Sequence, residues 1–336
     1  MLKNIIILII LAISCKCMYY ETLDAVSHLK TKELFKIWHY LNNKSYSLNS
    51  QEALNRYRVF KETVAFVKQR NSEQSDYKLG LGPFADMSFE EFSSKMLSEN
   101  VDLKEITRNL GVSFDEMADD DEIMINKKVK TDVDWSSIFG YVRDQGHCGS
   151  CWTFGVTAPI EAAIAIRDKT ACVPLSTQQL VDCNLENKGC NGGGYGRALK
   201  YIIEKGLNLE SDYKYEAVRK TCKFDSNKSV VRIKSYKQCS SCSHDALDAL
   251  LAKGPLSTAV EVTREFQHYR NGILNAKCSK SPNHAIVMVQ RNEEFIKIRN
   301  SWGTKFGENG YIRIKHDDKN NFSCFTERNI YLPLLN

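Results

Sequence analysis

The sequence predicts an α+β fold in which a helix-rich part precedes a strand-rich part. A mainly apolar stretch from Trp152 to Ile166 is typical of one long buried helix. Short apolar runs bounded by turn residues follow Leu256 and indicate strands. The expected strands are 257–260, 284–289, 295–299 and 310–314. With 336 residues, 43% of them apolar, the chain has enough material for two compact units and a substantial core.

The N-terminus has the layout of a secretory signal peptide. Lys3 precedes nine apolar residues at 5–13, and Ser14 to Cys17 follow, so residues 1–17 are expected to be removed. Nine residues are too few to span ~30 Å of hydrocarbon, and no later run approaches ~18 apolar residues, so we expect no stable membrane insertion. The signal predicts the secretory pathway, with a secreted or lysosome-like destination. Three glycosylation sequons fit that route; they begin at Asn43, Asn227 and Asn321.

The region from about Thr31 to Leu97 is expected to form a separate helical unit. It is charged and periodic, and no cysteine occurs between Cys17 and Cys148. Five of its residues recur on one helix face; they are Glu52, Arg56, Phe60, Val67 and Asn71. The polar, charge-rich segment at 98–130 is typical of an exposed linker that a protease can cut, near 126–131.

The charge balance excludes nucleic acid as an expected partner. The formal charge is +5, from 46 basic and 41 acidic residues. No block of Lys and Arg with interleaved aromatics, of the kind that follows a phosphate backbone, occurs in the sequence.

Cys148-Gly149-Ser150-Cys151 stands at the start of the predicted buried helix. A helix N-terminus favours an anion, so Cys151 suits a thiolate nucleophile. Two cysteines at this spacing also fit a redox dithiol, structural thiols, or half of a zinc site completed by Cys183 and Cys190. The tetrapeptide alone leaves these alternatives open.

Three longer segments resemble the papain-like cysteine proteases of the cathepsin L type, in preproenzyme form. They are Gln145-Gly146-His147-Cys148-Gly149-Ser150-Cys151-Trp152, Asn283-His284-Ala285, and Asn300-Ser301-Trp302-Gly303. The resemblance runs from about Glu33 to Pro333. It implies a papain-like two-domain fold, with a helical left domain, a β-barrel-like right domain and an active-site cleft between them. A helical inhibitory propeptide would precede it. The implied division is a signal peptide at 1–17, a propeptide at 18–128 with its core at 33–97, and a peptidase domain at 129–336.

The resemblance also implies a role for each catalytic residue. Cys151 would attack the scissile carbonyl as a thiolate paired with the imidazolium of His284. Asn300 would orient the imidazole, and Trp302 would shield that contact. The Gln145 side chain and the Cys151 backbone N–H would form the oxyanion hole. No metal ion or organic cofactor is implied.

The resemblance assigns six cysteines to three disulfides. The pairs are Cys148 with Cys190, Cys183 with Cys222, and Cys278 with Cys324. Three cysteines remain over; they are Cys172, Cys239 and Cys242. Cys172 could pair with either of the others, and the Cys239–Cys242 spacing also permits a metal site.

Substrate-binding residues follow from the resemblance by position. Gly192 and Gly193 would pair with an extended substrate backbone, and Trp302 belongs to the same expected surface. Six residues would line the pocket for the side chain two places before the cut: Gly194, Tyr195, Ala259, Asn283, Ala285 and Asn329. Because Asn329 is neutral, the pocket is expected to favour a medium-sized apolar side chain over Arg.

The resulting hypothesis is a latent endopeptidase that becomes active when its propeptide is removed. Its expected partners are protein or peptide substrates, its own propeptide and cystatin-like inhibitors, and the expected state is a monomer. Two rivals remain: a catalytically inactive homologue that binds proteins, and a disulfide oxidoreductase using Cys148 and Cys151.

Overall fold

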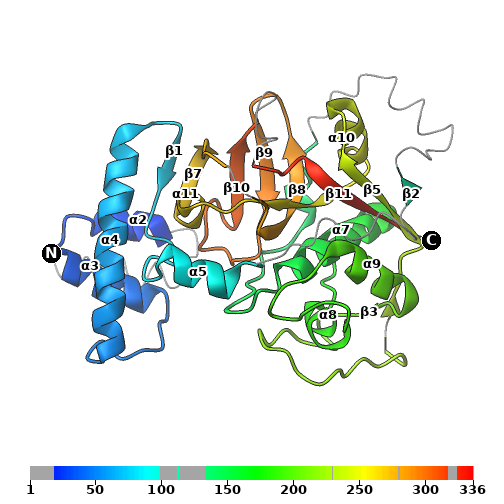
Figure 1. The fold of residues 1–336 in the computed structure, drawn as a ribbon, viewed down its shortest axis with the longest axis horizontal. Helices are drawn as coiled ribbons and strands as arrows, with labels where there is room; N and C mark the ends of the chain where they lie inside the picture. The colour runs from blue at the N-terminus through cyan, green and yellow to red at the C-terminus, as the bar shows by residue number, and fades with distance from the viewer. Residues whose placement is uncertain are drawn as a thin grey trace.

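The computed structural model describes residues 19–98, 112–113, 133–228, 230–278, 281–316 and 324–335 (Figure 1). The expected signal peptide and the expected processing site near 126–131 lie outside these residues. Among the helices described, none is long and apolar enough to cross a membrane.

The N-terminal part, expected to be a propeptide and here called the prosegment, is helical and is drawn in blue and cyan in Figure 1. Its helices are α2 (Tyr19–Ala25), α3 (Thr31–Leu41), α4 (Gln51–Glu73) and α5 (Phe89–Met96). The prosegment has a core of its own, in which the Phe35, Trp38 and Phe60 rings lie within 6.1 Å of one another. Ser50 and Ser88 cap the first turns of α4 and α5.

Residues on the predicted face of α4 connect this helix to α5 and to the strand that follows it. Arg56 forms a two-point ion pair with Glu91 of α5, with N–O distances of 2.5 and 2.8 Å. The Asn71 carboxamide bonds both the N–H and the C=O of Leu79 in strand β1 (Tyr77–Leu79), at 2.8 and 2.9 Å. The helix is therefore fixed to the strand that follows it.

The helix-rich part that follows residue 133 is built around α7 (Cys151–Asp168), which is buried along most of its length. Its other elements are η3 (Trp135–Ile138), α8 (Thr177–Cys183), α9 (Tyr195–Glu204), and the short strands β3 (Leu207–Asn208) and β4 (Val230–Val231). The long apolar helix expected at 152–166 is thus present, one residue longer at its start and two longer at its end.

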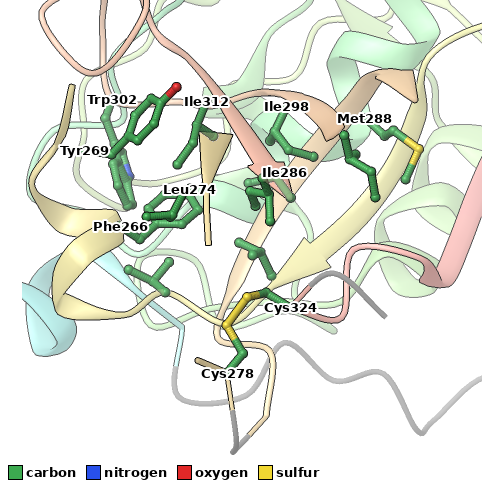
Figure 2. Close-up of a cluster of buried hydrophobic side chains, with 14 of the residues drawn as sticks. Phe266, Tyr269, Leu274, Cys278, Ile286, Met288, Ile298, Trp302, Ile312 and Cys324 are labelled. Atoms are coloured by element: carbon green, nitrogen blue, oxygen red, sulfur yellow. A yellow bond between two sulfur atoms is a disulfide. The ribbon is translucent and has the colours of Figure 1, made fainter. Parts of the chain in front are cut away.

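The strand-rich part is a sheet whose order is β1-β7-β10-β9-β8-β6-β11-β5-β2. Four strands were expected from the apolar runs: β6 (Leu256–Val260), β8 (His284–Arg291), β9 (Phe295–Arg299) and β10 (Tyr311–Lys315). The others are β2 (Val112–Ser113), β5 (Ser235–Ser241), β7 (Tyr269–Leu274) and β11 (Arg328–Leu334), with helices α10 (His244–Leu251) and α11 (Arg264–Gln267) between strands. Figure 2 shows the apolar side chains that fill the core of this part, with the Cys278–Cys324 bridge at one end.

The prosegment docks on the strand-rich part by extending its sheet. Strand β1 pairs antiparallel with β7, and Tyr77 lies opposite Gly272. A Cβ at Gly272 would lie 2.5 Å from the Asp76 carbonyl and from the Tyr77 Cα, so only glycine fits. Phe84 and Phe92 then pack edge-on against the Trp302 ring, with centroids 5.5 and 5.1 Å away.

The structure forms the three disulfides that the resemblance implied: Cys148–Cys190, Cys183–Cys222 and Cys278–Cys324. A fourth bridge joins Cys239 to Cys242. Cys172 therefore pairs with neither of these two cysteines and is a free thiol, as is Cys151.

Candidate active site

Cys151 is the first residue of α7, where the helix dipole and unpaired N–H groups face its side chain. The Cys148–Cys190 bridge and a 2.8 Å bond from Gly149 N–H to the Cys190 carbonyl hold the loop before the helix. The Ala285 N–H donates to Cys151 Sγ at 3.5 Å, so the nucleophile lies beside the start of β8. Helix-rich and strand-rich parts therefore meet at this sulfur.

His284 is the first residue of β8, and Asn300 follows the end of the neighbouring strand β9. The two residues are linked by a 2.7 Å hydrogen bond from His284 Nε2 to Asn300 Oδ1, which also accepts the Ser301 N–H at 2.8 Å. His284 Nδ1 has no partner within the described part of the chain. With Nε2–H donating to Asn300, Nδ1 is the ring nitrogen that remains for Cys151.

Trp302 covers this pair. Its ring centroid lies 4.6 Å from that of His284, and the indole is 1% exposed. This position is compatible with the shielding role expected of Trp302.

Gln145 is held in one orientation from both ends. Its Oε1 accepts from Ser301 Oγ at 2.6 Å and from Trp302 Nε1–H at 3.1 Å. The amide nitrogen must then point the other way, where it donates to the Cys148 carbonyl at 2.9 Å and to the Met96 carbonyl at 2.8 Å. Met96 belongs to the prosegment, so a prosegment carbonyl occupies the expected oxyanion donor.

The prosegment continues across the site after Met96. The Ser98 N–H donates to the Asn283 carbonyl at 3.0 Å. A Cβ at Gly192, where φ is +104°, would lie 2.1 Å from Ser98 Oγ, so the chains touch closely here. Cys151 and His284 are both 0% exposed beneath this segment.

Burial shifts the pKa values of Cys151 and His284. Burial raises the pKa of the Cys151 thiol to about 11, against the opposing effect of the backbone N–H groups of Ala285 and Trp152. Burial also lowers the pKa of His284 to about 4, although its bond to Asn300 acts in the opposite direction. Both shifts favour the uncharged thiol and imidazole.

The expected substrate-binding residues lie on or next to α9, β6, β8 and β11. Ala259 and Ala285 face each other in the β6–β8 register, and Asn283 directly precedes His284. Gly194 caps α9, of which Tyr195 is the first residue, and Asn329 lies in β11 with a φ of +52°. Gly193 packs against Trp152, whose ring would lie 2.6 Å from a Cβ at this position.

Sequence reasoning missed three contributions to the site. Ser301 lies inside a matched segment, yet its hydroxyl orients Gln145, and the backbone N–H of Ala285 contacts the nucleophile. Met96 and Ser98, which block the site, lie outside the segments that carry the family resemblance. They contact the site through the Met96 carbonyl and the Ser98 N–H, and a pattern of side chains in the sequence does not predict such backbone contacts.

The described residues contain one group with the spacing of a metal site: His244, His316 and Glu327. The guanidinium of Arg291 already occupies it, 2.7 Å from Glu327 Oε1 and 3.0 Å from His316 Nε2. A second carboxylate, Asp248, binds the same guanidinium at 2.8 Å. This arrangement fits an ion-pair network. The zinc and redox alternatives for Cys148 also do not fit, because its sulfur is bonded to Cys190.

Comparison with known proteins gives two family matches. Residues 129–334 match the papain family cysteine protease domain. Residues 35–92 match the cathepsin propeptide inhibitor domain (I29). The chain belongs to the papain family of cysteine proteases.

Individual papain-family relatives match over almost the whole chain. Papain from Carica papaya is 32% identical over 322 residues, which cover 94% of this chain and 91% of papain. A cathepsin L-like proteinase from Fasciola hepatica is 34% identical over 303 residues, 86% of this chain and 89% of the relative. Digestive procathepsin L 3 from Tenebrio molitor larval midgut superimposes with a TM-score of 0.77 at 30% identity, over 91% of this chain and 100% of that one.

The family match and the fold agree on the type of enzyme. The chain is a cysteine-type peptidase with a papain-like fold, preceded by an inhibitory propeptide. It is therefore a zymogen of a cysteine endopeptidase.

Proposed function

We propose that the processed enzyme hydrolyses peptide bonds through Cys151 and His284. The Cys151 thiolate attacks the scissile carbonyl, and His284 gives its proton to the leaving amine. Water, activated by His284, then hydrolyses the acyl-enzyme. Asn300 keeps the imidazole in position through the 2.7 Å bond to Nε2.

The observation that carries this proposal is the prosegment carbonyl on Gln145. The Met96 oxygen accepts from Gln145 Nε2 at 2.8 Å. The same nitrogen donates to the carbonyl of Cys148, three residues before the buried Cys151 at the helix N-terminus. A substrate oxygen taking the same place would gain its negative charge next to this donor and the Cys151 backbone N–H. The site thus has a donor aimed at a carbonyl oxygen close to the nucleophile.

Latency has a steric and an electrostatic part in this proposal. The segment from Met96 to Ser98 covers the nucleophile, and burial favours the uncharged thiol and imidazole. Removal of the prosegment readmits water and substrate, so desolvation no longer opposes the thiolate–imidazolium pair. Cleavage in the linker near 126–131 would release the active enzyme.

The further expectations concern the surroundings of the enzyme. We place it in the secretory pathway, with a secreted or lysosome-like destination, and expect Asn43 and Asn227, both exposed, to be glycosylated there. Its partners would be protein substrates, whose extended backbone pairs with Gly192 and Gly193, and cystatin-like inhibitors. The enzyme would act as a monomer without a cofactor.

Labelling with an epoxide thiol-protease inhibitor tests the catalytic assignment. The processed enzyme should take up one equivalent, on Cys151, and His284→Ala should abolish the labelling. Cys172 provides a matched control, because it is the other free thiol, and Cys172→Ala should label as wild type does. Labelling on Cys148 would favour the oxidoreductase, and no labelling together with no hydrolysis would favour the inactive homologue.

Comparison of the unprocessed and processed protein tests latency. The unprocessed protein, with its prosegment verified as intact by mass, should hydrolyse peptides far more slowly than the processed form. Equal rates would show that the Met96–Ser98 segment does not block the site.

A further inference from the structure

We propose that Tyr195 closes the pocket for the substrate side chain two residues before the cut, so that the processed enzyme selects small side chains there. This inference rests on the proposed function and refines it. Tyr195 begins α9 immediately after the Gly192–Gly194 strip. Its ring belongs to the same buried cluster of side chains as Cys151 and Ala285.

The Tyr195 side chain is inserted into the interior and is 3% exposed. Its hydroxyl donates to the carbonyl oxygens of Thr258 at 2.7 Å and Ile286 at 3.1 Å, and shares its single hydrogen between them. Thr258 and Ile286 are register partners in β6 and β8, one residue from the Ala259–Ala285 pair. The tyrosine thus fills the space between the helical part and the two alanines that were expected to line an open pocket.

Gly155 of α7 provides the room for this ring. A Cβ at Gly155 would lie 2.2 Å from the Tyr195 hydroxyl oxygen and 2.9 Å from the ring carbon Cε1. On the other side, the Tyr331 ring meets Tyr195 edge-on, with centroids 5.4 Å apart. The ring is therefore enclosed by a glycine on one side and an aromatic ring on another.

A large substrate side chain would have to displace this ring. Displacement would remove the donor from two buried carbonyl groups and would empty a close-packed volume, and both changes are unfavourable. A small side chain such as Ala, Ser or Thr needs no displacement. The prosegment residue that lies between Gly192 and Asn283 is itself small, namely Ser98. The inference replaces the medium-sized apolar preference expected from the sequence.

Two matched peptide substrates test the inference on the processed enzyme. They differ only at the residue two places before the cut, which is Ala in one and Phe in the other. Wild type should cleave the Ala peptide with at least a tenfold higher kcat/KM. Tyr195→Ala should raise the Phe-to-Ala ratio of kcat/KM at least tenfold, whereas Tyr195→Phe, which retains the ring, should keep the wild-type ratio.

A second tyrosine of α9 serves as the control. The Tyr201 hydroxyl accepts a hydrogen bond from Gln179 Nε2 of α8 and is not among the expected substrate-binding residues, so Tyr201→Ala should leave the ratio unchanged. The Phe-to-Ala ratio of kcat/KM does not depend on enzyme concentration, so partial misfolding of a variant does not change it. Titration of Cys151 with the inhibitor measures the amount of folded enzyme. If Tyr195→Ala does not fold, a peptide-library profile of wild type decides: small side chains support the inference, and Leu or Phe overturns it.

The outcomes separate this inference from the proposed function. Absence of both cleavage and Cys151 labelling would overturn the proposed function. Cleavage that favours Phe, or an unchanged ratio in Tyr195→Ala, would overturn the role of Tyr195 alone.

Discussion

Replacing Phe84 with alanine should release the prosegment from the active site without touching any catalytic residue. The Phe84 ring is 6% exposed and packs against Trp302 of the peptidase and Phe92 of its own prosegment, at 5.5 and 5.0 Å. Truncating a buried Phe typically costs about 3–5 kcal/mol. Undocking breaks the contact of Phe84 with Trp302 of the peptidase but leaves its contact with Phe92 of the prosegment. We therefore assign half of this cost, about 2 kcal/mol, to docking. Losing it corresponds to roughly a 30-fold increase in the undocked fraction.

The rate at which an epoxide inhibitor labels Cys151 in the intact zymogen measures that fraction, because a covered thiol does not react. Phe84→Ala should therefore label roughly 30-fold faster than wild type, with the rate of the processed enzyme as the upper limit. Leu54→Ala is the matched control, since Leu54 lies on the prosegment helix α4 and is 61% exposed. Labelling of Phe84→Ala at the wild-type rate would refute the view that this aromatic contact holds the prosegment closed.

Three further outcomes follow from the site and the prosegment. The hydrogen-bonded ion pair with Arg56 lowers the pKa of Glu91 from 4.5 to about 2. The ion pair therefore stabilises the folded zymogen fully above about pH 4.5, and this stabilisation is lost as the pH falls towards 2. Thermal melting of the Glu91→Gln zymogen should vary less than wild type across that window; equal pH profiles would contradict this. Gln145→Ala should lower kcat about 10²- to 10³-fold with little change in KM in steady-state assays, and an unchanged kcat would remove its oxyanion role. Thiol titration of the unfolded, unreduced chain without its signal should find two thiols, Cys151 and Cys172; more than two would contradict the fourth bridge.

The proposed catalytic residues could be singled out from the sequence because each stands in a distinctive local segment. Cys151, His284, Asn300 and Gln145 required only their neighbours in sequence to be singled out. Their meeting point follows from the fold, since α7 supplies Cys151, and β8 and the end of β9 supply His284 and Asn300.

One strand that sequence reasoning missed, β5, lacks a strong apolar pattern. Strand β5 reads Ser-Tyr-Lys-Gln-Cys-Ser-Ser and is held mainly by pairing with β11, its distant neighbour in sequence. Pairing of this kind depends on tertiary context more than on local propensity. The addition of β1 to β7 is of the same type, because it joins two units that the sequence separates.

The pocket shows a different limit of sequence reasoning. Tyr195 was expected among the lining residues, but its burial depends on Gly155, forty positions earlier, and on two backbone carbonyls. The pairing of Cys239 with Cys242, which leaves Cys172 free, could likewise not be predicted from the number of cysteines, because it depends on which of them lie close together in the fold.

Gly272 in β7 affects the enzyme even after the prosegment has been removed. In the zymogen its missing side chain lets Tyr77 approach, and its φ of +90° suits glycine in any case. Once β1 departs, β7 loses the partner on that side and becomes an open border of the sheet, with free backbone donors and acceptors. After processing, the enzyme therefore keeps an exposed strand edge whose backbone fitted β1. The positive charge of the neighbouring Arg270 then disfavours the pairing of other chains with this edge.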